Sequence, residues 1–445
     1  MNKVAAFFHN KDVLNRVLFT LAIFLVFRIG SAITVPGVTV NESVWDNRYD
    51  SFSILNMMGG GALQNFSIFA LGVSPYITSQ IIVQLLSMDV LPALTAMTKE
   101  GETGRKKMDV VTRMLSVVLA AIQAYGIIVA LQNASGLTVN DTSAWGYTKI
   151  ILFMITGSMM LNWMGDQITD KGIGNGISMI IFAGIISSLP SQLQTAFDSF
   201  VNERANTGDP SLILQGSVQI VVYILAYIAI IIFVTFIEKS VRKLPVSHSN
   251  QSQSNDEVTT KSSFLPIKVN ASSVMPVIFA SSIMVAPSII ISLFSNGNPP
   301  AWAQKIEEVF NYQQMTKMGN SSFPWGTIIY AVLIIAFSYF YSQLEINPER
   351  IAENFQNSGT YITGIKPGTE TERYISKTLS RITFLGALSL TLVALLPLIL
   401  TLSGAVPQSL ALGGTGLIIV VGVALEINNQ INGILAGNGY AESEL

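Results

Sequence analysis

Residues 51 to 87 read SFSILNMMGGGALQNFSIFALGVSPYITSQIIVQLLS, and this stretch decides the fold. Its first part, residues 51 to 71, is too polar and glycine-rich to cross a bilayer but too apolar to be a free loop. That combination predicts a short helix that re-enters a cavity, where irregular backbone at membrane depth is tolerated, and such a helix could act as a stopper. An amphipathic helix lying on the outer headgroups is the alternative interpretation. The second part, residues 72 to 87, is apolar but short, and its hydropathy alone predicts a half-span.

Longer apolar stretches flank this segment on both sides. A helix that crosses about 30 Å of hydrocarbon needs roughly 20 mostly apolar residues. We therefore expect ten membrane-spanning helices, at residues 17 to 34, 72 to 87, 109 to 131, 147 to 165, 176 to 194, 213 to 237, 271 to 294, 325 to 344, 382 to 401 and 408 to 425.

The composition agrees with a membrane protein. Half of the 445 residues are hydrophobic and 12% are charged, against about 25% charged residues in soluble domains. The net charge of -2 predicts no direct attraction to nucleic acid. The chain has no cysteine, and its two histidines, His9 and His248, lie in polar segments outside the spans. We therefore expect no metal site, no cofactor, no catalytic residue and no enzymatic activity.

Acidic residues are absent from the interior of the predicted spans, because Asp109, Asp166, Glu238, Glu345 and Glu426 all fall at span ends. Ion-coupled and proton-coupled transporters normally bury such groups along their pathway, so their absence counts against a secondary transporter. It also counts against an intramembrane protease, which needs an activated water or nucleophile. No G-x-x-x-x-G-K-[ST] motif occurs, so the energy for any transport has to come from a partner.

Lysine and arginine set the predicted orientation. They concentrate in the N-terminal segment, residues 1 to 16, and in alternate loops, including two large hydrophilic loops at residues 238 to 270 and 345 to 378. By the positive-inside rule both termini are cytosolic, including the tail at residues 428 to 445. The first span contains Arg28 and has no clear cleavage site, so we expect it to be retained. The two large loops are expected to receive a partner, with solvated connectors as the alternative.

The ten spans divide into two sets of five, at residues 17 to 195 and 213 to 427. In each set prolines are expected to interrupt the second span, Pro75 in the first set and Pro276 with Pro287 in the second. Corresponding interruptions in two halves indicate a central passage.

Eight stretches occur in the order and at the spacing of one known family. They are FRIGSAITVPG (27 to 37), GGALQNFSIFALGVSPYITSQIIVQLL (60 to 86), KEGETGRKKMD (99 to 109), GDQITDKGIGNGISMIIFAGI (165 to 185), LPIKVN (265 to 270), PVIFASSI (276 to 283), NPERIAENFQNSGTYITGIKPGTETERYI (347 to 375) and GGTGLIIVV (413 to 421). On these motifs the chain resembles bacterial SecY, the central subunit of the general protein-export channel, over essentially its whole length. The resemblance implies a place in the bacterial plasma membrane.

The resemblance implies an all-α clamshell of two pseudo-symmetric five-helix halves around an hourglass pore. The re-entrant helix would plug this pore on its outer side, with a centre formed by Asn56, Met57, Met58, Gly59, Gly60 and Gly61. An aliphatic ring would constrict the pore, and its members would be Val73, Ile77, Ile177, Ile181, Ile278 and Ile419. A narrow apolar constriction dewets at rest and so resists water and ions. Lipid-facing or helix-packing roles are the alternative for each of these side chains taken alone.

The family also opens sideways, between the second and third spans on one side and the seventh and eighth on the other. Signal sequences bind at this seam, and apolar segments leave through it into the membrane lipid. Candidate seam residues are Thr78, Ile81, Gln123, Ile283 and Ala286. Ordinary interhelical packing is a compatible alternative for these residues.

The resemblance further implies that this chain works with partner proteins. A SecE subunit would clamp the two halves, a SecG subunit would sit alongside, and the SecA ATPase or a translating ribosome would dock on the two large loops. The cargo would be unfolded preproteins with their signal peptides. The expected docking residues are Lys366, Arg242, Lys243 and Lys268, with solvated charge as the alternative for the last three.

Two departures from the family pattern bear on these contacts. Lys366 stands where the family typically has arginine, which keeps the charge but loses bidentate hydrogen bonding. The loop after Lys243 carries Asp256 and Glu257 in place of a basic run. The leading interpretation is a passive, partner-driven channel for unfolded polypeptides. An accessory SecY paralogue dedicated to a subset of exported proteins is the alternative, and a secondary transporter is a more distant one.

Overall fold

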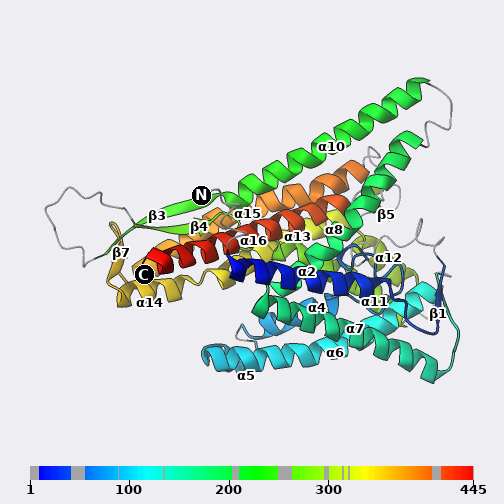
Figure 1. Cartoon of the computed structure of the whole chain (residues 1–445), viewed down its shortest axis with the longest axis horizontal. Helices are drawn as coiled ribbons and strands as arrows, with labels where there is room; N and C mark the ends of the chain where they lie inside the picture. Colours follow the sequence, from blue (N-terminus) through cyan, green and yellow to red (C-terminus); the bar gives the residue numbers. More distant parts are fainter. Residues whose placement is uncertain are drawn as a thin grey trace.

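A computed structural model describes the chain at residues 10–41, 56–88, 90–133, 136–202, 210–248, 263–294, 300–312, 315–318, 321–402 and 412–443. Each of the ten predicted spans coincides with a helix, and these helices run roughly side by side in one bundle (Figure 1). They are α2 (Lys11–Ala32), α4 (Ser74–Leu86), α6 (Glu102–Asn133), α7 (Ala144–Lys171), α8 (Gly176–Phe197), α10 (Pro210–Lys239), α11 (Met275–Phe294), α13 (Trp325–Glu345), α15 (Thr369–Leu402) and α16 (Leu412–Ser443).

Eight of these helices are long and apolar enough to cross a membrane, counted over the described residues. The two exceptions are α4, with 13 residues, and α11, whose apolar part is Met275–Ile291. The short α4 agrees with the half-span predicted from hydropathy. Because α4 and α11 are the second helices of the two sets of five, the short helices occupy corresponding places in the two halves.

The prolines expected to interrupt the second spans do not break these helices. Pro75 and Pro276 are each the second residue of their helix, where the missing backbone N–H leaves no hydrogen bond unmade. Pro287 lies inside α11, which continues past it to Phe294. The prediction that these prolines break the second spans was therefore wrong. Pro75 and Pro276 instead mark where the two short helices begin.

The helices pack mainly with neighbours from their own half. In the first half α4 packs on α6, α6 on α7, and α7 on α8, while in the second half α13 packs on α15 and α10 on α16. The two halves meet where α11 lies against α4 and α6, and again where α8 lies against α16. Apolar side chains on the outer faces stay exposed, most clearly Leu214 and Phe236 of the outlying helix α10. These faces are suited to lipid.

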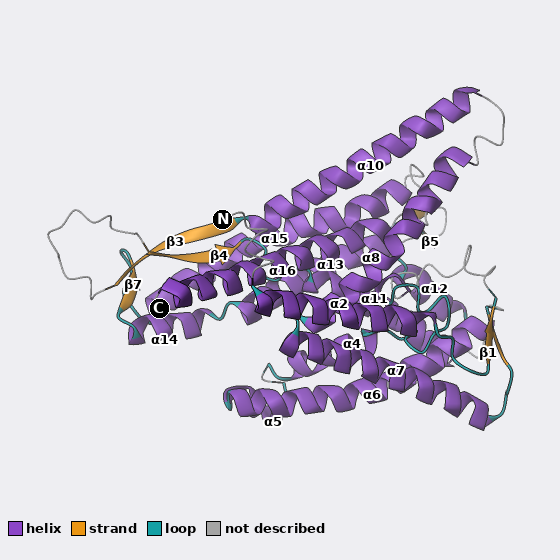
Figure 2. Ribbon diagram, viewed as in Figure 1, coloured by secondary structure: helices purple, strands orange, loops and turns teal. Residues whose placement is uncertain are grey.

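A three-stranded antiparallel sheet lies beyond one end of the bundle (Figure 2). It has the order β4-β3-β7 and consists of β3 (Val241–His248), β4 (Ser263–Lys268) and β7 (Thr360–Ile362). The two large loops predicted from the sequence are therefore parts of one structure, because Val246 of the first pairs with Ile362 of the second. Buried Leu244 and Val246 anchor this sheet to α15 through Leu379 and Ile375. We call this end of the bundle the sheet end.

Shorter elements complete the described fold. At the opposite end of the bundle β1 (Val38–Val40) pairs with β2 (Leu137–Val139). The remaining elements are α5 (Pro92–Lys99), the π-helical turn η2 (Asp198–Asn202), α12 (Ala301–Phe310), β5 (Thr316–Met318), β6 (Ser321–Phe323) and α14 (Pro348–Asn357). Helix α16 continues through the predicted cytosolic tail, residues 428 to 445, as far as Ser443.

Candidate functional site

The six predicted ring residues all belong to one large apolar cluster with residues from both halves. They reach it from four helices of both halves, and five of them are buried. Ile177 is partly buried and packs against this cluster. The helices place them as follows: Val73 caps the start of α4, Ile77 lies in α4, Ile177 and Ile181 in α8, Ile278 in α11 and Ile419 in α16.

A cavity of about 180 Å³ lies against this cluster. Its apolar lining consists of Met275, Phe279 and four of the predicted ring residues, Ile77, Ile177, Ile181 and Ile278. The remainder is largely polar and includes Tyr76, Gln80, Asp166, Thr169, Asn175 and Ser178. The chamber therefore has a mixed lining, with polar groups on part of its wall and apolar side chains on the rest.

The chamber and the plug segment, residues 56 to 71, lie on opposite sides of the ring. Along α8 the chamber-lining Ile177 and Ile181 come first, and Gly184, which contacts the plug segment, follows one turn later. Along α11 the chamber is lined around Ile278, and a second pocket, beside plug residues, is lined further on by Val285. On both helices the contacts with the plug segment therefore follow the ring residues that line the chamber.

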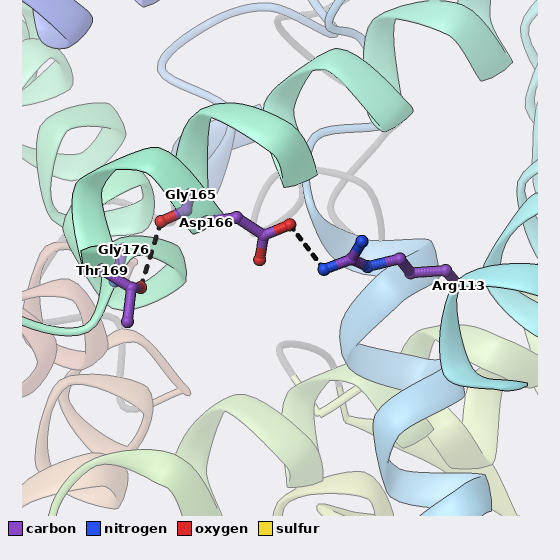
Figure 3. Close-up of polar contacts among 5 residues, drawn as sticks. All are labelled: Arg113, Gly165, Asp166, Thr169 and Gly176. Carbon is purple, nitrogen blue, oxygen red and sulfur yellow. Dashed lines mark hydrogen bonds and ion pairs between the residues drawn. The ribbon is translucent and has the colours of Figure 1, made fainter. Parts of the chain in front are cut away.

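The end of α7 and the start of α8 contact each other closely just before Ile177 (Figure 3). The Gly176 N–H donates to Thr169 Oγ1 at 2.9 Å, and that hydroxyl donates to the Gly165 carbonyl at 3.1 Å. A Cβ on Gly176 would collide with the Gly165 carbonyl oxygen, so only glycine permits this approach. The side chain of Asn175 caps α8 by accepting from the N–H groups of residues 177 and 178.

An ion pair holds the other side of α7 to α6. Arg113 Nη2 lies 2.9 Å from Asp166 Oδ2, and both groups are partly exposed (Figure 3). Asp166 also lines the chamber, so this pair places the guanidinium of Arg113 and a carboxylate beside the chamber wall. In the described part of the chain the other two ion pairs lie between Lys106 or Lys107 and nearby glutamates.

The plug segment is mostly turns rather than a helix. Residues 51 to 55 of the predicted plug lie outside the described residues, and in the rest only Asn56–Met58 is helical. Gly60 and Gly61 have φ angles of +66° and +83°, which a right-handed helix cannot contain. The expected re-entrant helix is thus a single turn followed by tight turns within the part that the structure describes.

Glycines on the surrounding helices let the plug segment approach them closely. A Cβ on Gly184 of α8 would lie 3.0 Å from the Gly60 nitrogen and nearer still to the Met58 carbonyl oxygen. A Cβ on Gly416 of α16 would lie 3.3 Å from the Met57 side chain. Met57 itself is buried in the same apolar cluster as the ring. The plug segment therefore packs directly against the far side of the ring.

The predicted seam residues lie on α4, α6 and α11, the helices through which the two halves meet on one side. Ile81 is buried, while Thr78, Ile283 and Ala286 are partly buried. Gln123 is buried too, and its Oε1 has no hydrogen-bond partner among the described residues.

Sequence reasoning missed an apolar cluster that crosses this seam. Val285 and Ile289 of α11 share an apolar cluster with Ala124 and Ile128 of α6. No periodicity of either helix alone distinguishes these residues from other aliphatics.

A polar contact also crosses between the halves. Tyr341 of α13 donates from its hydroxyl to Gln84 Oε1 of α4 at 3.1 Å. The two residues lie 257 positions apart, so no local pattern could reveal the pair. The polar character of Gln84 inside a span was the one available signal.

The four predicted docking cations are exposed at the sheet end. Lys366 lies in the tight connection between β7 and α15, where Gly364 and Gly368 both have positive φ. Arg242, Lys243 and Lys268 lie on the paired strands β3 and β4. The Lys243 ammonium lies 4.6 Å from the centre of the Phe264 ring. The sheet therefore brings cations from both loops to one end of the bundle.

Ten helices in one bundle, with a cavity and the plug segment beside one shared apolar cluster, define a polytopic membrane protein. Comparison with known proteins names the class. The SecY family model matches residues 67–428. A protein translocase subunit SecY from Halalkalibacterium halodurans is 42% identical over 440 residues, which cover 98% of both chains.

Two further comparisons agree. A protein translocase subunit SecY 1 from Lactobacillus kefiranofaciens is 41% identical over 437 residues, which cover 97% of both chains. A solved structure of a protein-conducting channel is 18% identical, with a TM-score of 0.64 over 95% of this chain and 92% of that one. The chain belongs to the SecY family and is a multi-pass membrane protein of the protein translocase.

Proposed function

We propose that this chain forms the pore through which unfolded polypeptides cross the bacterial plasma membrane, with both termini and the sheet end in the cytosol. The aliphatic ring between the polar chamber and the plug segment carries this proposal. The concentration of lysine and arginine at the sheet end supports the orientation, by the positive-inside rule. Cargo would then enter the polar chamber, pass the ring and displace the plug segment.

The chemistry of the ring suits an unselective passage. Aliphatic side chains hold no hydrogen-bonding group that could favour one peptide sequence over another. A narrow apolar constriction excludes water and ions by dewetting while it is closed. Branched side chains contributed by four separate helices can also close around a chain of varying width. We propose Val73, Ile77, Ile177, Ile181, Ile278 and Ile419 as this ring.

The seam provides an exit to lipid for apolar segments. We propose that α4 and α6 separate there from α11 and α13, at Thr78, Ile81, Gln123, Ile283 and Ala286. An apolar signal segment gains roughly 0.3 to 0.6 kcal/mol per Leu, Ile or Phe on the membrane-insertion scale. Opening the seam exposes apolar side chains to lipid rather than to water, so it costs little hydrophobic free energy.

External partners supply the force and the clamp in this proposal. The exposed cations Lys366, Arg242, Lys243 and Lys268 are the proposed docking residues for a SecA-type ATPase or a ribosome. The long outward apolar face of α10 is buried very little by the chain itself, which leaves room for SecE and SecG as neighbouring subunits.

The test is reconstitution in vesicles with SecE, SecG, SecA and ATP. A secretory preprotein should become protected from added protease, and a version without its signal segment should not. A cysteine introduced as Ile278→Cys should crosslink to a stalled cargo chain, because the native chain contains no competing thiol. Vesicles that take up a small solute against its gradient but never protect a preprotein would overturn the proposal.

A further inference from the structure

Arg28 is a charged residue inside the first membrane-spanning helix. It lies in the stretch FLVFRIG, one turn before the end of α2, and its neighbours Val26 and Ile29 are exposed apolar side chains. A charge at this depth is costly, so such residues usually have a specific partner. The partner of Arg28 is the plug segment, because Nη1 donates to the Gly60 carbonyl oxygen at 2.9 Å.

We call residues 56 to 61 the plug tip. Among the described residues, the bond from Arg28 is the one side-chain hydrogen bond between the plug tip and a surrounding helix. The other hydrogen bonds of residues 56 to 61 stay within the plug segment, such as Gly61 N to the Asn56 carbonyl and Gln64 N to Asn56 Oδ1. The remaining contacts of the tip are apolar packing and the close approach to Gly184. Hydrogen bonds from a charged donor are about twice as strong as neutral ones.

The same turn of α2 also holds the base of the plug segment. Phe27 stacks on Phe69 with ring centroids 6.1 Å apart and planes inclined by 15°. Gly30 makes room for that ring, because a Cβ there would lie 2.7 Å from the Phe69 ring carbon Cζ. The base is anchored further by the Ser158 hydroxyl, which donates to the Gly72 carbonyl at 3.0 Å. The base of the plug segment thus makes several contacts with the surrounding helices, while the plug tip makes one hydrogen bond to them, with Arg28.

We propose that Arg28 is a positioning residue that latches the plug tip shut through the Gly60 carbonyl and so determines how apolar a signal segment must be to open the channel. The inference rests on the proposed function for the role of the signal segment. The docked and undocked plug are two states in equilibrium, and a bond made in only one of them shifts their ratio. Loss of a charge-assisted bond should raise the undocked fraction about 10-fold to 100-fold.

The test is Arg28→Leu, read out by alkylation of a single cysteine placed as Met57→Cys. Met57 is only 5% exposed when the tip is docked, so its modification rate reports the undocked fraction. The rate should rise about 10-fold to 100-fold in the leucine variant. Leucine is far better tolerated than arginine in a membrane span, so a failure to insert is not expected.

Two further variants complete the test. Arg16→Leu is the matched control, since Arg16 also lies in α2 and donates to a glycine carbonyl, at Gly172, which is not part of the plug segment. Its alkylation rate should equal that of the parent. Arg28→Lys keeps a charged donor and should stay within a few-fold of the parent rate. An unchanged rate in Arg28→Leu, an equal rise in Arg16→Leu, or a lysine variant as fast as the leucine variant would each overturn the proposal.

Export supplies the second readout. In a strain that depends on this chain, Arg28→Leu should allow secretion of a reporter whose signal segment is too polar for the parent to export. The alkylation measurement needs no cargo, so the two failures are distinguishable. A faster alkylation with no preprotein ever exported by any variant would retain the latch and refute the proposed function. A faster alkylation together with normal export and an unchanged signal requirement would refute the role of Arg28 in selecting cargo.

Discussion

The contact between Gly184 and the plug segment gives a sharp prediction about the closed channel. In Gly184→Ala the new Cβ would lie 3.0 Å from both the Gly60 nitrogen and the Met58 carbonyl carbon, and closer to the Met58 oxygen. All three are backbone atoms, which cannot rotate away as a side chain could. The plug tip must therefore move for the methyl group to fit.

The magnitude follows from two opposing effects on α8. Alanine favours a helix over glycine by about 1 kcal/mol, but this gain is equal in the docked and undocked states and cancels from the docking equilibrium. Overpacking costs about 1–3 kcal/mol, and only the docked state bears that cost. The undocked fraction should therefore rise by a factor of about 5 to 150.

The assay is the resting ion conductance of the purified channel in a planar bilayer, without cargo or motor. Gly184→Ala should raise the mean conductance several-fold or more. Gly433→Ala is the matched control, because it places the same substitution in helix α16, where an added Cβ meets nothing within 4 Å. Equal conductances in the parent and Gly184→Ala, or an equal rise in Gly433→Ala, would refute the reasoning.

Three other predictions concern the ring, the sheet end and the α7–α8 contact. Ile278→Asn should make the resting channel leak ions, since it puts an amide into an apolar constriction, whereas Ile278→Val should not; bilayer conductance decides. Lys366→Glu should abolish secretion of a reporter while the protein remains inserted, with Lys366→Arg as the control, and unimpaired secretion would contradict the docking role. Gly176→Ala should lower the free energy of unfolding by about 3 kcal/mol or more, because its Cβ would collide with the Gly165 carbonyl. An unchanged unfolding temperature in detergent would contradict that close approach.

The helices of this fold could be predicted from the sequence because the bilayer imposes a length and an apolar composition on each span. All ten predicted spans coincide with helices, and α4 has the short length expected from its hydropathy. The ends of the helices were harder to predict from the sequence. The helix α15 begins at Thr369, inside a predicted loop, because its first turns are polar and extend past the apolar part.

The ring and the seam were less predictable than the spans, for a physical reason. Aliphatic residues fill most membrane helices, so no chemistry distinguishes Ile278 from an isoleucine that faces lipid. Only the resemblance to a known family placed the ring residues, and the structure brings them into one cluster. The Tyr341–Gln84 bond and the sheet that joins both large loops depend on pairings distant in sequence, which no local pattern contains.

The same physics explains why the seam and the plug segment are held by so few directional contacts. Between helices in lipid the hydrophobic effect contributes almost nothing, so the halves stay together through packing and hydrogen bonds. Across the seam the described structure provides an apolar contact at Val285 and Ile289 and the hydrogen bond from Tyr341 to Gln84. At the plug tip it provides glycine-permitted packing and the Arg28 bond. Each of these contacts is worth only a few kcal/mol, which is within reach of an apolar segment of some ten residues inserting at about 0.3 to 0.6 kcal/mol each. A channel held shut in this way resists ions at rest and still opens to a signal segment without consuming nucleotide itself.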